Sequence, residues 1–71
     1  MLEKREIAVA WVERVLREPE RTETDSADPT LEHHLGRIAD FDNRVLRVIV
    51  RPSGGYLLVV TAYFDRRSTR S

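Results

Sequence analysis

Arginine is the residue type in this sequence best suited to binding a charged ligand, since it supplies eleven of the twelve basic side chains. A guanidinium group donates two parallel hydrogen bonds to a phosphate or a carboxylate. Arg47 and Arg51 fall on one side of a strand-like segment, and Thr61 and Tyr63 follow in the next such segment. A tyrosine ring stacks on a base, and a hydroxyl group contacts a phosphate oxygen. The side chains expected to bind RNA or an acidic partner are Arg47, Arg51, Thr61, Arg66 and Arg67.

The two histidines of the chain, His33 and His34, are the candidates for a general base that works near neutral pH. Adjacent residues of a strand point to opposite faces, so at most one of them reaches the arginines. The same geometry argues against a shared metal site between them. We take His34 as the catalytic histidine. The full set of catalytic candidates is His34, Arg37, Arg47 and Tyr63.

No metal ion and no cofactor are expected. The sequence contains no cysteine, and Glu32, Asp40 and Asp42 lack the spacing of metal ligands. The segment "SGG" at 53–55 lacks the helix and the lysine of a phosphate-binding loop, so it is expected to be a turn.

A second hypothesis gives the arginines no catalytic role. Alternating arginines also occur as solvated side chains that keep a sheet from aggregating. The net charge is zero and the pI is near 6.7, whereas nucleic-acid-binding domains tend to be basic. However, residues 1–35 hold nine acids against five bases, and residues 36–71 hold three acids against seven arginines. A non-catalytic interaction module, with an acidic partner protein or a second copy on its cationic face, is therefore the alternative.

A helix is predicted over about residues 6–18, where apolar residues recur at spacings of three and four in "IAVAWVERVLREP". Pro19 ends it, because proline has no backbone N–H to donate. Trp11 lies in the middle of the apolar stripe, so we expect it in the core. An acidic loop follows over about 19–31, with a short edge strand expected at "RTET".

Strands are predicted over about 34–41, 44–51 and 56–64, and a flexible tail over 66–71. The connection "PSGG" decides which side chains share a face. We predict a three-residue loop, Ser53 to Gly55, because this register collects seven apolar residues on one face and the arginines on the other. Those seven residues are Leu46, Val48, Val50, Leu58, Val60, Ala62 and Phe64.

The expected fold is a single α+β domain, with one N-terminal helix packed on an antiparallel sheet of three or four strands. At 71 residues its core is thin. The absence of cysteine and of any long apolar run predicts a cytoplasmic protein with no membrane segment.

The segments "EIAVAWVERVLREPE", "LGRIADFDNRVLRVIV" and "LLVVTAYFDRR" resemble the bacterial domain-of-unknown-function family 4258. That family is similar in turn to RelE/ParE-like toxins, including the BrnT toxins. The resemblance implies a toxin-like protein of a toxin-antitoxin system, with metal-independent ribonuclease activity. Relatives usually begin with a further helix that carries a histidine and an arginine. This sequence starts almost at "KREI", so either that helix is absent or the start of the chain was set too late.

Overall fold

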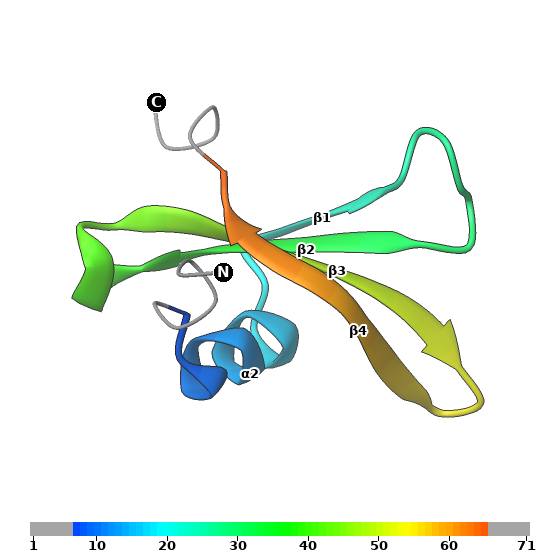
Figure 1. Cartoon of the computed structure of the whole chain (residues 1–71), viewed down its shortest axis with the longest axis horizontal. Helices are drawn as coiled ribbons and strands as arrows, with labels where there is room; N and C mark the ends of the chain where they lie inside the picture. The colour runs from blue at the N-terminus through cyan, green and yellow to red at the C-terminus, as the bar shows by residue number, and fades with distance from the viewer. Residues whose placement is uncertain (1–6, 66–71) are drawn as a thin grey trace.

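The computed structural model describes residues 7–65 of the chain. Helix α2 (Val9–Arg17) packs on one face of a four-stranded antiparallel sheet, in which the strands follow one another in the order β1-β2-β3-β4. Figure 1 shows the helix on one side of the sheet and the turn between β3 and β4 at the far end, away from the helix. The α+β prediction is confirmed.

Helix α2 is shorter than its apolar pattern predicts. Its end is set at Glu18, whose N–H donates to the carbonyl of Arg14 at 2.9 Å, and Pro19 follows without a donor. Arg14 and Arg17 lie in the last turn, where positive charge interacts favourably with the helix dipole.

The sheet consists of β1 (Arg21–Thr24), β2 (Glu32–Ile38), β3 (Arg44–Ser53) and β4 (Tyr56–Phe64). The short edge strand expected at "RTET" is β1, which pairs with β2. The strand predicted over 34–41 begins earlier, at Glu32, and its last three residues form a 3-10 helix, η1 (Ala39–Phe41). Asp42 and Asn43 follow with positive φ angles of 58° and 55°, which turn the chain back into β3.

The predicted three-residue loop between β3 and β4 is wrong. Ser53 pairs directly with Tyr56, so the loop is Gly54 and Gly55, both with positive φ. The register then shifts between Ile49 and Val50, which leaves one extra residue, Val60, on β4 as a β-bulge. The sequence predicted one extra residue in the turn. The structure has this extra residue in the middle of β4 instead.

The prediction of which residues share a face is correct on one side of the bulge and wrong on the other. Beyond it, Leu46 pairs with Phe64 and Val48 with Ala62, so these four residues share one face as predicted. On the turn side, Val50 pairs with Val59, and Leu58 lies opposite Arg51. Leu46 and Val48 on one side of the bulge and Val50 on the other are all fully buried, because the extra residue realigns β4 between the two sections.

The core lies between α2 and the sheet. Its fully buried members are Val15, Ile38, Leu46, Val48 and Val50. At Gly36 an added Cβ atom would lie 3.2 Å from Val15 Cγ2, so the helix approaches β2 closely at a residue without a side chain. Trp11 packs against this core, and its ring lies 5.6 Å from that of Phe41 and 6.0 Å from that of Phe64. Trp11 is thus on the predicted side of the helix, where it is partly buried at the border of the core.

Candidate functional site on the distal face of the sheet

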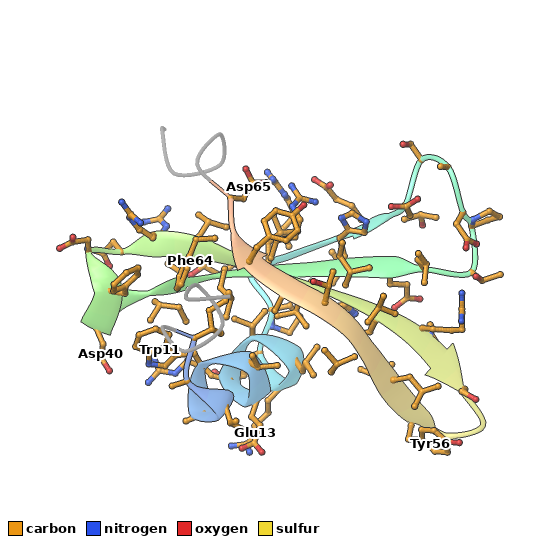
Figure 2. All side chains as sticks on the ribbon, viewed as in Figure 1. Trp11, Glu13, Asp40, Tyr56, Phe64 and Asp65 are labelled. Carbon is orange, nitrogen blue, oxygen red and sulfur yellow. The ribbon has the colours of Figure 1, made fainter. Side chains whose placement is uncertain are left out.

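The sheet face that points away from α2, called the distal face here, carries most of the predicted site residues. Cross-strand pairs define it: Leu35 opposite Arg47, Arg47 opposite Tyr63, and Ile49 opposite both His33 and Thr61. Figure 2 shows Asp65 on this side of the sheet and Trp11 on the other.

Arg47 is held by three neighbours on the distal face. Its Nε and Nη2 atoms donate to Asp65 Oδ2 at 2.8 and 2.6 Å. Its Nη1 atom donates to His33 Nδ1 at 2.6 Å and to Glu23 Oε1 at 3.5 Å. A guanidinium group has five N–H donors, and four of them are used by these contacts. The Arg47 side chain is only 13% exposed, so it is built into the sheet.

The contact with Arg47 fixes the tautomer of His33. A guanidinium group cannot accept a hydrogen bond, so His33 Nδ1 must be the acceptor and the ring is neutral. The proton then lies on Nε2, which donates to Asp25 Oδ1 at 2.7 Å. The other oxygen of Asp25 accepts the N–H groups of Ala27 and Asp28 at 3.0 and 2.9 Å. Neither ring nitrogen of His33 is therefore free to take a proton from a substrate.

We call these side chains the Arg47 network: Glu23, Asp25, His33, Arg47 and Asp65. The network crosses the whole sheet. Glu23 comes from β1, His33 from β2 and Arg47 from β3, and Asp65 directly follows β4. The backbone N–H of Asp65 donates to the carbonyl of Val45 at 2.8 Å, which holds the carboxylate beside β3.

The ionisation of the network follows from these contacts. The hydrogen bond from His33 lowers the pKa of Asp25, and the N–H groups of Asp28 and Ala27 lower it further. Burial acts to lower the pKa of Arg47, but the hydrogen bonds and charge of Asp65 outweigh it, so the net shift is upward. Arg47 is therefore a permanent cation that is neutralised mainly by Asp65.

Two more predicted arginines also face carboxylates. Arg37 Nε lies 3.7 Å from Glu20 Oε1, and Arg51 Nη2 lies 3.8 Å from Asp28 Oδ2. Arg37 does not join the contacts of Arg47. The distal face was expected to be half cationic, yet the acidic first half of the chain supplies carboxylates beside its arginines. Arg66 and Arg67 lie outside the described residues.

Tyr63 and Thr61 lie on the distal face as predicted. Tyr63 is the cross-strand partner of Arg47 and is 45% exposed, so its ring borders the Arg47 network and reaches solvent. Thr61 is exposed beside it, opposite Ile49.

His34, chosen from the sequence as the catalytic histidine, lies on the face covered by α2. It pairs with Val48, is 9% exposed, and its Nε2 lies 3.2 Å from Glu32 Oε1. His33 is instead the histidine beside Arg47. The sequence showed that His33 and His34 point to opposite faces. It did not show which of them shares a face with Arg47, because this depends on how β2 and β3 pair across the turn at Asp42 and Asn43. That pairing puts His33 on the face of Arg47.

Three carboxylates of the network, Glu23, Asp25 and Asp65, were not predicted from the sequence as site residues. Glu23 reaches Arg47 and Asp25 reaches His33 only because β1 folds back on β2, and no local motif marks these contacts. Within residues 7–65, no three acidic, histidine or cysteine side chains form a group that would hold a metal ion. No helix in the same range has the length and apolar character that a membrane span requires.

A family model described as a domain of unknown function, DUF4258, matches residues 1–64. The chain belongs to this family. The resemblance seen in "RVLRVIV" and "VVTAYFDRR" is thereby confirmed for DUF4258, and the match includes every described element of the fold. No curated protein and no solved structure matches the chain. The similarity to RelE-like toxins, and the activity it implies for this DUF4258 domain, stay predictions.

Proposed function

We propose that this protein is a protein-interaction module and that the edge strand β4 is its binding element. The observation that carries the proposal is the exposure of consecutive apolar residues on an edge of the sheet. Tyr56 is 60% exposed, Leu58 46%, Val59 49% and Val60 53%. β4 is the last strand of the four-stranded order, so its outer edge faces no other strand among the described residues.

The opposite edge of the sheet, strand β1, is protected against pairing with another strand. Strand β1 has four residues, "RTET", of which two are charged, and short charged strands resist edge-to-edge pairing. Strand β4 has nine residues, "YLLVVTAYF", and none of them is charged. An uncharged apolar edge is a template for an added strand, because its outward N–H and C=O groups bind an extended backbone.

The contacts on the distal face favour this proposal over catalysis. A general base needs a free lone pair, and both ring nitrogens of His33 are engaged. A phosphate would have to compete with Asp65 for Arg47, since Asp65 holds two of its donors at short distances. The Arg47 network is thus well suited to fastening the sheet that presents β4.

The test uses a labelled synthetic peptide that copies residues 56–64 between terminal lysines, with binding followed by fluorescence anisotropy. We expect the wild-type protein to bind it and L58K to bind at least tenfold more weakly, because a lysine disfavours strand pairing. T22K, which adds the same charge to β1, is the matched control and should bind like the wild type. A peptide that is N-methylated at alternate residues lacks the N–H groups that would hydrogen-bond to β4. If it binds as tightly as the unmodified peptide, the proposal is contradicted.

The second candidate function is that of a RelE-like toxin with metal-independent ribonuclease activity, neutralised by an antitoxin. One observation favours it: the half-exposed Tyr63 lies directly opposite Arg47, whose contact with Glu23 is its longest. An RNA phosphate would replace Glu23 at Arg47 Nη1. The ribose 2′-hydroxyl would attack this phosphate and lose its proton to water, while the Tyr63 hydroxyl would donate its proton to the leaving 5′-oxygen as the P–O5′ bond breaks; water then reprotonates the phenolate.

Cleavage of a mixed-sequence RNA in the presence of EDTA tests the second candidate. Y63F keeps the ring and removes the hydroxyl group, so it should lose activity at least a hundredfold. Y56F, the same change at the other end of β4, should retain full activity. Wild-type protein that is folded and leaves the RNA intact rules this candidate out.

A further inference from the structure

The part of β4 between its turn and its bulge projects beyond the helix. Tyr56 and Leu58 alternate with Leu57 and Val59 along it, so apolar side chains are exposed on both faces. Figure 2 shows Tyr56 at the tip of the β3–β4 hairpin, away from α2 and Trp11. A ligand for this edge must therefore cover an exposed backbone edge and two apolar surfaces at once.

We infer that a second copy of this chain occupies the edge, with the two β4 strands antiparallel about a two-fold axis. The resulting dimer has one continuous sheet of eight strands, because each copy contributes four. This inference rests on the proposed function and names the partner of the same strand.

Charge selects the second copy over an acidic partner. No charged residue lies between Tyr56 and Phe64, so an acidic segment would find no cation on β4 itself. The nearest arginine across the hairpin is Arg51, opposite Leu58, and Asp28 already lies 3.8 Å from it. A second β4 is matched to this surface: it is uncharged, apolar on both faces and of equal length.

The geometry of a two-fold pair fixes a register. Residues directly opposite each other in an antiparallel pair point to the same face, so a strand pairs with its own copy only through residues of equal parity. A two-fold axis at Leu58 satisfies this condition and places Leu57 opposite Val59 of the second copy. It also uses the whole section between the turn and Val60, where the bulge ends regular pairing.

Sedimentation velocity over a wide concentration range tests the dimer. We expect the wild type to sediment as a dimer and L58K to lose at least nine tenths of it, because two like charges would lie opposite each other on the axis. T22K, on the opposite edge, should remain dimeric. Because Leu58 is 46% exposed, L58K should keep the circular dichroism spectrum of the wild type; a dimer of L58K equal to that of the wild type overturns the inference.

Engineered cysteines test the register, since the chain has none of its own. L58C should form a disulfide with its own copy under mild oxidation. L57C alone should form far less, because its counterpart lies two positions along the strand, beyond the usual Cα separation of a disulfide. Mixing L57C with V59C should give the mixed disulfide, and a stronger self-disulfide of L57C than of L58C contradicts the register.

The two experiments separate this inference from the proposed function. A wild-type protein that stays monomeric at every concentration, yet binds the β4 peptide, shows that β4 takes another strand and that the second copy is the wrong partner. A monomer that binds no peptide excludes both.

Discussion

Arg47 of β3 is the residue on which contacts from β1, from β2 and from Asp65, directly after β4, converge. Its hydrogen bonds reach Asp65 and His33, and Glu23 lies at its rim. A partly buried cation paired this closely stabilises the fold mainly because removing it leaves its partners unsatisfied. Arg51 lies on the same strand and face, but it is half exposed, and its Nη2 atom lies 3.8 Å from Asp28 Oδ2. It therefore provides a matched comparison.

We predict that R47Q lowers the free energy of unfolding by about 1.5–3 kcal/mol, the range for hydrogen bonds to charged groups. R51Q should change it by less than about 1 kcal/mol, because exposed ion pairs contribute little. Urea denaturation at neutral pH measures both variants. Equal losses from the two would show that the Arg47 network does not fasten the sheet.

At the scale of the elements, the β3–β4 hairpin combines a tight turn with a bulge. Gly54 and Gly55 have φ angles of 53° and 93°, and two-residue hairpin loops require such positive values. Val60 is the extra residue that brings the two apolar rows back into alignment. The turn therefore sets the register of the section that we propose as the binding edge.

The two glycines of the turn should respond differently to substitution. G54N should leave the melting temperature nearly unchanged, because asparagine tolerates the left-handed region at a φ of 53°. G55A should destabilise the protein by roughly 1 kcal/mol or more, because alanine is strained at a φ of 93°. Thermal unfolding compares the two, and a tolerated G55A would mean that the turn readily adopts another conformation.

At the scale of the whole molecule, helix α2 covers part of one sheet face, and the core formed by residues 7–65 is small. Trp11 closes it by packing against Phe41 and Phe64, whose rings are themselves 4.8 Å apart. The core ends before the tip of the β3–β4 hairpin, which is why that tip keeps its apolar residues exposed.

We predict that W11A lowers the free energy of unfolding by about 3 to 5 kcal/mol, which is the cost of removing a large core aromatic. Glu13 lies on the exposed side of the same helix, so E13A should have almost no effect. Loss of the cooperative melting transition in W11A alone is the expected result. A melting curve that is the same for W11A and the wild type would show that the aromatic cluster is dispensable.

The sequence by itself determined the features that depend on neighbouring residues. The apolar spacing around Trp11 specified the helix and its buried side, and Pro19 placed its end. The alternation in "RVLRVIVR" and "YLLVVTAYF" specified two strands and the alternate faces of each. These patterns work because side-chain direction repeats within each element.

Only the tertiary structure decided the features that depend on pairing between distant segments. The register between β2 and β3 placed His33 instead of His34 beside Arg47. The fold-back of β1 brought Glu23 to Arg47 and Asp25 to His33. The bulge at Val60 could not be predicted from the sequence either. One extra residue aligns the apolar residues of the two strands whether it lies in the turn or within β4. Register is a property of two strands together, so it is settled by the combined burial and hydrogen bonding of both.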